Sequence, residues 1–274
     1  MRNRVFNPIG TVALVTGASS GLGAGYAREL AERGADLVLT ARRQERLEGL
    51  AVELAEKYGT VSTVIPLDLA APGGVAELVN DLHSRDITIG TLVNNAGFAT
   101  SGDLVDADPA RLAGEVSLNV AALTALTRAL LPDLLHTSRA QPASAALVNL
   151  ASTAAFQPVP GMAVYGATKA YVLSFTEALW YETRDSGLKV TAICPGAVDT
   201  EFFEVAGRRP DSRRDLLTVA EVMRTTFAAL DRASTPPHAV SGLRNTVLAG
   251  VAGRLPHRAV VNAVGRMNRS GPTA

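Results

Sequence analysis

The chain has 274 residues, of which 47% are hydrophobic and 19% are charged, a composition typical of folded globular proteins. Lys plus Arg and Asp plus Glu both count 26, so the net charge is zero, which argues against nucleic acid or a general anionic surface as a partner. The single cysteine, Cys194, excludes an internal disulfide and fits a reducing compartment.

The first ten residues carry Arg2 and Arg4, but no apolar run like that of a signal peptide follows them before Gly17. No window contains the roughly 18 uninterrupted apolar residues that a membrane-spanning helix needs. We therefore expect a cytoplasmic protein without an integral membrane segment. Cys194 lies in an apolar pattern before Pro195, which predicts a small buried side chain rather than a reactive thiol.

From Thr11 to about Ile193, short apolar runs alternate with helical patterns. Such runs are typical of strands buried on both faces, and their alternation with helices predicts a doubly wound, Rossmann-type parallel sheet of about seven strands with helices on both faces. No linker divides the chain, so residues 1–274 are expected to form one domain. Pro132 predicts a kink or an early end in the fourth helix. The expected strands are 12–15, 37–39, 61–66, 89–93, 145–150 and 189–193, and the expected helices are 21–33, 43–58, 73–85, 109–136 and 164–186.

A glycine-rich turn follows the first strand and reads Thr16-Gly17-Ala18-Ser19-Ser20-Gly21-Leu22-Gly23. A strand, a glycine turn and a helix in this order can bind a dinucleotide, because glycines let the backbone approach the pyrophosphate and the helix N-terminus offers free N–H groups. The spacing is G-x3-G-x-G rather than the G-x-G-x-x-G fingerprint. The alternative is a plain turn in which Ser19 or Ser20 caps the helix.

The second strand ends in Thr40-Ala41-Arg42-Arg43, without the acid that usually binds the ribose 2′-hydroxyl in an NAD site. Arg42 is placed to meet a 2′-phosphate, with Arg43 or Ser19 assisting, which favours NADP over NAD. The alternative is a solvated helix start. At the end of the third strand, Asp68, followed by Leu69, is placed to accept from an adenine amine or to cap the helix after Pro72.

The fourth strand ends in Asn94-Asn95-Ala96-Gly97, where two amides and a glycine can line a cofactor. Asn119 lies among apolar residues in the next predicted helix. A buried amide within a helix needs hydrogen-bond partners, so Asn119 is either part of a site or a satisfied core residue.

The segment from Ser152 to Lys169 reads S-x12-Y-x3-K. Tyr165 and Lys169 are four residues apart, which on a helix places them on one face. An ammonium beside a phenol stabilises the phenolate and lowers a pKa that is ordinarily about 10, giving an acid and base usable near neutral pH. Y-x3-K by itself often arises by chance as a surface pair.

Taken together and in order, these motifs and Pro195-Gly196 resemble those of the short-chain dehydrogenase/reductase family over roughly residues 10–200. The resemblance implies that Tyr165 is the acid/base, that Lys169 holds the nicotinamide ribose and lowers the tyrosine pKa, and that Ser152 binds the substrate carbonyl. It also implies that Asn119 positions a water in a proton relay. The cofactor site that the turn and the resemblance imply comprises Gly17, Ser19, Ser20, Gly21, Leu22, Gly23, Arg42, Asp68, Leu69, Asn95, Ala96, Gly97, Tyr165, Lys169, Pro195, Gly196, Val198 and Thr200.

The expected function is NADPH-dependent reduction of a ketone or aldehyde, or the reverse oxidation of an alcohol, on a medium-sized apolar substrate, without a metal. One alternative is an NAD-dependent alcohol dehydrogenase. Another is a non-catalytic protein that senses NADP(H), but such a protein has no reason to keep Ser152, Tyr165 and Lys169 together.

After Thr200 the regular pattern fails. The resemblance implies that residues 201–232 form a lid over the substrate, with Phe202 and Phe203 as an apolar wall; the alternative is that both pack on the sheet. We expect a helix at 216–232, a short seventh strand at 238–241, a helical extension at 243–269 around Pro256 and a disordered tail at 270–274. The extension either docks on the protein, where it can cover the cleft, or touches a membrane surface, and the zero net charge favours docking.

The helix expected at 109–136 is apolar almost all round. A helix of this kind predicts a partner subunit in addition to the sheet. Family members commonly pair through this helix and the one that carries Tyr165, so the resemblance implies a homodimer or homotetramer.

Overall fold

The computed structural model describes residues 5–207, 216–252 and 255–269. Within these residues the strands form one seven-stranded sheet in the order β3-β2-β1-β4-β5-β6-β7, and every pairing is parallel. The order reverses between β1 and β4, which opens a crevice there at the carboxyl ends of the strands. The predicted doubly wound sheet is therefore confirmed. The strands are β1 Val12–Thr16, β2 Asp36–Ala41, β3 Ser62–Pro66, β4 Ile89–Asn94, β5 Ala146–Leu150, β6 Lys189–Cys194 and β7 His238–Val240.

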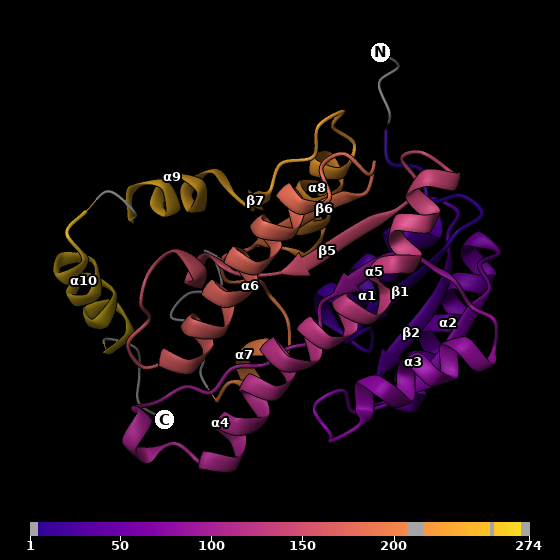
Figure 1. The fold of residues 1–274 in the computed structure, drawn as a ribbon. Helices are drawn as coiled ribbons and strands as arrows, with labels where there is room; N and C mark the ends of the chain where they lie inside the picture. The colour runs from indigo at the N-terminus through magenta and orange to yellow at the C-terminus, as the bar shows by residue number, and fades with distance from the viewer. Residues whose placement is uncertain (1–4, 208–215, 253–254, 270–274) are drawn as a thin grey trace.

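Helices cover both faces of the sheet (Figure 1). Alternate strand residues point to opposite faces, so Val15 and Leu39 pack with α1, α2 and α8, whereas Leu14 and Val38 pack with α3, α5 and α6. Each fully buried leucine or valine contributes about 1.5–3 kcal/mol, which makes these two layers the main source of stability. The helices are α1 Gly21–Glu32, α2 Gln44–Tyr58, α3 Gly74–Ser84, α4 Pro109–Val116, α5 Leu123–Ala140, α6 Ala163–Glu182, α7 Phe202–Val205, α8 Val219–Leu230, α9 Leu243–Ala252 and α10 His257–Arg269.

The long helical stretch departs from its prediction. It continues through Pro132 to Ala140, so the helix does not end at that proline. Pro132 lies on the exposed side of α5, where the carbonyl that loses its N–H partner can bind water. The irregularity lies instead in a π-helical turn, η2 Ser117–Ala122, which joins α4 to α5 and contains Asn119.

By length and composition alone, the stretch Pro109–Ala140 is able to span a membrane, and it is the one helix among the described residues that meets that test. Its apolar face is occupied in the fold, because Leu126, Leu130 and Leu134 are buried in the core between α5 and the sheet. A core helix with a wholly buried leucine row satisfies the same length and composition test.

The C-terminal part follows the expected order. β7 extends the sheet at its edge, and α8 begins at Val219 rather than at 216 because Thr218 and Glu221 form a capping box. α9 and α10, at the left of Figure 1, lie beyond the edge strand β7. Within the sequence predicted as a lid, 208–215 lie outside the described residues, as does the predicted tail 270–274.

Candidate active site

A cleft of about 990 Å³ lies at the carboxyl ends of the strands, where the sheet order reverses. This volume is at the upper end of the range for small-molecule sites. The loops that follow β1, β2, β4, β5 and β6 form its floor, and α7 and α10 add walls. Most of the predicted site residues line it, and Gly23 and Asn119 do not. The lining residues that the sequence indicated are Gly17, Ser19, Ser20, Gly21, Leu22, Arg42, Asp68, Leu69, Asn95, Ala96, Gly97, Ser152, Tyr165, Lys169, Pro195, Gly196, Val198, Thr200, Phe202 and Phe203.

The glycine turn after β1 requires its glycines. Gly17 and Gly21 have φ values of 66° and 52°, which other residues rarely adopt. A Cβ on Gly23 would lie 2.1 Å from the Gly17 carbonyl oxygen, so α1 can pass beneath the turn only without a side chain there. Asn95 fixes the turn by donating from Nδ2 to the Thr16 carbonyl at 2.9 Å. The turn is thus a rigid cradle of backbone N–H groups at a helix N-terminus.

Arg43 organises the serines of this turn. Ser20 occupies the N-cap position of α1 but accepts no helix N–H, so the predicted capping role for Ser19 or Ser20 is wrong. Arg43 donates to Ser20 Oγ at 2.8 Å and to Ser19 Oγ at 3.1 Å, and it forms an ion pair with Glu201 at 2.8 Å. Arg42 lies beside it on the cleft lining and is exposed.

Glu201 connects this corner to the start of α7. It pairs with Arg46 as well as Arg43, and these two guanidinium groups lower the pKa of its carboxyl. No sequence pattern indicates this contact, because Arg43 and Glu201 are 158 positions apart. Two cations and a carboxylate therefore meet at one end of the cleft.

Asp68 does not cap a helix, so that alternative is wrong. Its Oδ1 accepts from the Ala70 N–H at 2.9 Å, which shapes the turn after β3, and Gly73 occupies the N-cap position of α3 instead. Asp68 and the neighbouring Leu69 both line the cleft.

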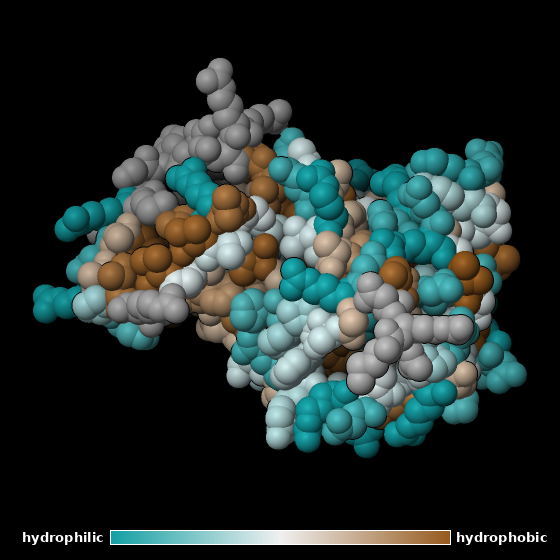
Figure 2. Space-filling model, turned by 90° about the horizontal axis from the view of Figure 1, so that it is seen from above, coloured by the Kyte–Doolittle hydropathy of each residue, from teal (hydrophilic) through white to brown (hydrophobic). Residues whose placement is uncertain are grey.

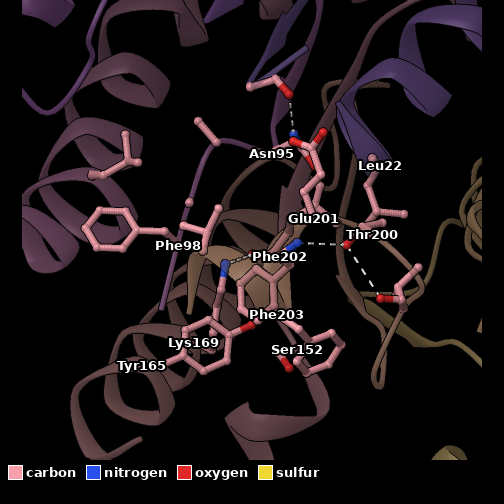
Figure 3. Close-up of a pocket in the computed structure, with 18 of the residues that line it drawn as sticks. Leu22, Asn95, Phe98, Ser152, Tyr165, Lys169, Thr200, Glu201, Phe202 and Phe203 are labelled. Atoms are coloured by element: carbon pink, nitrogen blue, oxygen red, sulfur yellow. Dashed lines mark hydrogen bonds between the residues drawn. The ribbon is translucent and has the colours of Figure 1, made fainter. Parts of the chain in front are cut away.

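Ser152, Tyr165 and Lys169 meet at the other end of the cleft (Figure 3). Ser152 follows β5, and its Oγ accepts from the Ala154 N–H at 3.1 Å. α6 holds Tyr165 and Lys169 one turn apart, both buried, with Lys169 Nζ 5.7 Å from the centre of the tyrosine ring. Lys169 Nζ also donates to the Leu150 carbonyl at 2.6 Å, which fixes the ammonium at the end of β5.

Burial controls the protonation of this pair. It raises the pKa of Tyr165 to about 12, although hydrogen bonding with Ser152 opposes the rise. It lowers the pKa of Lys169 to about 8. The expectation that Lys169 lowers the tyrosine pKa is therefore not met in this structure, because the loss of solvation has the largest effect and Lys169 is not among the groups that shift the pKa of this phenol. Tyr165 is a protonated phenol at neutral pH.

Asn119 is fully hydrogen-bonded behind the cleft. Its Nδ2 donates to the Phe98 carbonyl at 2.9 Å and to Thr168 Oγ1 at 3.1 Å, while its Oδ1 accepts from the Phe98 N–H at 3.2 Å. A Cβ on Gly97 would lie 2.8 Å from Asn119 Oδ1 and 3.6 Å from Lys169 Nζ. Asn119 thus ties the loop after β4 to α6, close to the lysine.

The substrate end of the cleft is mostly apolar. Phe202 faces Tyr165 with ring centres 5.5 Å apart, and Phe203 packs edge-on against Phe202 at 5.6 Å. Sequence reasoning had not assigned several residues of this wall, which lie on five separate segments and share no motif: Phe98, Arg111, Met162, Val205, Val264 and Asn268. Among the described residues no group of three or more His, Cys, Asp or Glu is placed to hold a metal ion.

Cys194 is buried in the core and does not line the cleft. Burial raises the pKa of its thiol to about 12, so it remains protonated at neutral pH and serves as a small core side chain. This agrees with its predicted role as a packing residue.

Comparison with known proteins gives concordant matches. The family model described as short chain dehydrogenase matches residues 11–210. Sulfoacetaldehyde reductase 2 of Chromohalobacter salexigens is 39% identical over 192 residues, which cover 70% of this chain and 74% of that protein. A short-chain dehydrogenase from Sphingobium yanoikuyae, solved in complex with NADPH, has a TM-score of 0.78 and 36% identity over 88% of this chain and 93% of that one. The bulky-bulky ketone specific alcohol dehydrogenase from Comamonas testosteroni has a TM-score of 0.73 and 30% identity over 90% and 95%.

Proposed function

The chain belongs to the short-chain dehydrogenase/reductase family of oxidoreductases, and from this premise we propose that it reduces a medium-sized apolar ketone or aldehyde with NADPH, or oxidises the corresponding alcohol. One observation carries the proposal. Ser152, Tyr165 and Lys169 converge at one end of a cleft whose other end combines a glycine cradle with two arginines. A binding protein without turnover does not need that trio.

The cleft fits a dinucleotide. The tight turn at Gly17 and Gly21 and the N-terminus of α1 offer a pyrophosphate site. The inner half of the cleft is lined by residues that follow β6, namely Pro195, Gly196, Ala197, Val198 and Thr200. A bound nicotinamide cofactor would supply the hydride. Lys169, buried beside the inner half, is placed to hold its ribose hydroxyls.

The residues of the chain then handle the oxygen and the proton. A carbonyl oxygen that gains negative charge needs donors close to its final position, and the hydroxyls of Ser152 and Tyr165 point into the same part of the cleft (Figure 3). Tyr165 is protonated at neutral pH and gives its phenolic proton to the oxygen, which becomes the alcohol. Lys169, charged below its pKa of about 8, stabilises the phenolate that remains. Phe202 shields this step from water.

The preference for NADP over NAD rests on Arg42 and Arg43, which line the adenosine end of the cleft. The lining residues at the end of β2 and in the loop after it include no Asp or Glu. A guanidinium group binds a phosphate bidentately. The solved relative from Sphingobium yanoikuyae was crystallised with NADPH. Glu201 already pairs with Arg43, so a 2′-phosphate that binds there shares the Arg43 guanidinium with this carboxylate or displaces the carboxylate. Arg42 also lines the cleft and can bind the phosphate.

The substrate end supports an apolar ketone more than a charged one. Phe98, Met162, Phe202 and Phe203 supply much of the wall, and the Arg111 guanidinium is held by the carbonyls of Ala99 and Val205. One solved relative is specific for bulky-bulky ketones, whereas a curated relative is a sulfoacetaldehyde reductase. Both substrate types therefore belong in the test.

The test begins with a panel of bulky ketones, aldehydes, their alcohols and sulfoacetaldehyde, with turnover measured from the change in NADPH absorbance. We expect the highest kcat/KM on bulky ketones. The Tyr165→Phe variant should lose turnover by at least about a hundredfold, since the proton donor is gone, while it still binds NADPH. Equal turnover in the variant and the wild type contradicts the proposed chemistry. Loss of NADPH binding in the variant assigns Tyr165 to cofactor binding instead.

Cofactor choice is tested separately by binding. The Arg42→Ala and Arg43→Ala variants should weaken NADPH by about tenfold or more and leave NADH nearly unchanged. Arg46→Ala is the matched control, because Arg46, on α2, also pairs with Glu201 but does not line the cleft. If neither arginine variant changes the ratio of the two dissociation constants, the NADP preference is wrong and the NAD-dependent alternative stands.

We further infer that the chain forms a homodimer or homotetramer through α5 and α6. Tyr171 and Tyr181 on α6 are 40% and 60% exposed, which is high for aromatic side chains on a helix of the main layer. The part of the expected lid that covers the substrate end in this proposal is α7, because it places Phe202 against Tyr165, whereas α8 packs in the core with α1 and β1.

A further inference from the structure

α9 is an apolar helix that buries few of its side chains. Leu243, Val247, Leu248 and Val251 are 83%, 57%, 56% and 44% exposed, and Leu255 in the following turn is 47% exposed. Figure 2 shows the result as a brown surface over this end of the molecule. Scattered apolar residues on a surface are normal, but four on one short helix and a fifth shortly before the next helix indicate an interaction site.

The charge of the same part of the chain is strongly one-sided. The last acidic residue in the sequence is Asp231, and residues 232–274 contain no Asp or Glu. The overall net charge of zero conceals this, because the remainder of the chain holds a compensating excess of acidic residues. Six arginines fall in the acid-free segment: Arg232, Arg244, Arg254, Arg258, Arg266 and Arg269.

We propose that the exposed apolar side chains of α9, together with Leu255, dock on an anionic lipid bilayer. A helix that exposes leucine and valine within a purely basic segment has the two features of an interfacial membrane helix, since apolar side chains enter the acyl boundary and arginines meet anionic headgroups. A second copy of the chain is the competing occupant. If two copies paired through α9 about a two-fold axis, the basic segment of one copy would face the basic segment of the other. Neither segment contains an acidic residue that could offset the repulsion.

The docking face lies next to the cleft. α10 is anchored to the body by buried Val260 and by Asn268, whose Nδ2 donates to the Pro160 carbonyl at 2.7 Å. Val264 and Asn268 on α10 line the cleft. A docked α9 therefore places the cleft wall close to the bilayer, and if the proposed function holds, an apolar ketone reaches the site from the lipid phase.

The test is flotation of the full chain with lipid vesicles. We expect binding to phosphatidylcholine vesicles that contain about three parts in ten of phosphatidylglycerol, little binding to phosphatidylcholine alone, and loss of binding at about 0.5 M NaCl. Val247→Asp should reduce binding by about tenfold or more. Val52→Asp, on α2, is the matched control because Val52 is also 57% exposed. Arg258→Glu should weaken binding, whereas Arg139→Glu, an exposed arginine at the end of α5, should not.

Three outcomes overturn the proposal: no binding to anionic vesicles at low salt, equal effects of Val247→Asp and Val52→Asp, or a self-association that Val247→Asp abolishes, which assigns the face to a second copy. Flotation needs neither cofactor nor turnover. A failed docking face and a failed enzymatic proposal therefore give separate readouts, and NADPH turnover without lipid supports the function even if docking fails.

Discussion

At the scale of single residues, Lys169 couples stability to pH. Its amine has an ordinary pKa of 10.5 and a pKa of about 8 when buried, so between these values the folded chain binds fewer protons than the unfolded chain. The free energy of unfolding must then rise with pH in that window. Relative to Lys169→Met, we expect the wild type to gain on the order of 3 kcal/mol between about pH 7.5 and pH 10.

Urea unfolding at the two pH values measures this gain. Tyrosine and cysteine titrations are common to both proteins and cancel when the two are compared. The hydrogen bond to the Leu150 carbonyl, which methionine cannot make, offsets the two stability curves by a constant amount and cancels when the gains between the two pH values are compared. Parallel stability curves for the two proteins would show that Lys169 keeps its charge in the folded state.

Glu115 is a second buried ionisable residue near the site. Its side chain is fully buried, and Thr100 is the neighbour that can hydrogen-bond with its carboxylate. Burial raises its pKa, with Thr100, Arg111 and Lys169 as the opposing influences. A carboxyl with a raised folded pKa stabilises the fold at acid pH and loses that contribution as pH rises through the raised value.

Glu115→Gln should therefore be more stable than the wild type near pH 7.5, by about 1–3 kcal/mol, because the amide avoids a buried charge. The advantage should shrink toward about pH 4.5, where the wild-type carboxyl is protonated. Thermal unfolding at both pH values measures it, with Glu182→Gln on the exposed side of α6 as the control. A less stable Glu115→Gln at neutral pH means that the charge is paired.

Residue motifs predicted the site well only where the chemistry is local. Ser152, Tyr165 and Lys169 lie close in sequence, and β5 and α6 bring them together without help from distant segments. The partner of Arg43 was not predictable, because Arg43 follows β2 whereas Glu201 follows β6, and β1, β4 and β5 lie between these two strands in the sheet. The tyrosine pKa was also missed, since a sequence pattern gives the charge of a neighbour but not the loss of solvation.

At the scale of elements, the boundary errors have physical causes. Pro132 was expected to end a helix, yet its exposed position lets water satisfy the free carbonyl. α8 begins three residues later than expected because of its capping box. Strands were easier, since β1, β2, β4, β5 and β6 are short runs that are buried along most of their length.

Two helical glycines allow the steric need for glycine to be tested separately from its low helix propensity. In α1, a Cβ on Gly23 would lie 2.1 Å from the Gly17 carbonyl oxygen, whereas in α2 a Cβ on Gly49 meets nothing within 4 Å. Gly49→Ala should stabilise the protein by up to about 1 kcal/mol, because alanine is the better helix former. Gly23→Ala should destabilise it by about 1–3 kcal/mol and weaken NADPH binding, because the turn must move.

Denaturant unfolding and NADPH titration of both variants check this pair. The Gly49→Ala protein serves as the control for the substitution itself and should bind NADPH as the wild type does. Normal cofactor affinity in Gly23→Ala would show that the turn tolerates displacement and is not the rigid cradle inferred from Gly17 and Asn95.

At the scale of the whole molecule, the alternation of strands and helices was enough to predict the sheet, because right-handed crossovers leave few ways to connect parallel strands. The same reasoning could not place the C-terminal extension. α10 packs on the body through Val260 and lines the cleft, as expected of a docked helix, while α9 remains exposed. Net charge was a poor guide there, since it averages a basic end with an acidic remainder.

Two exposed surfaces of the molecule should therefore have different partners, and one experiment can separate them. Tyr171 on α6 stacks on Phe175 with ring centres 5.8 Å apart and meets Thr124 on α5 at 3.0 Å, so it marks the proposed subunit interface. Tyr171→Asp should lower the mass measured by light scattering to that of a monomer, since a carboxylate in an apolar interface is costly. Val247→Asp should leave the mass unchanged, because α9 is the proposed lipid-docking face and not the proposed subunit interface. If Val247→Asp dissociates the oligomer and Tyr171→Asp does not, the subunits pair through α9 and the two surfaces have been assigned the wrong way round.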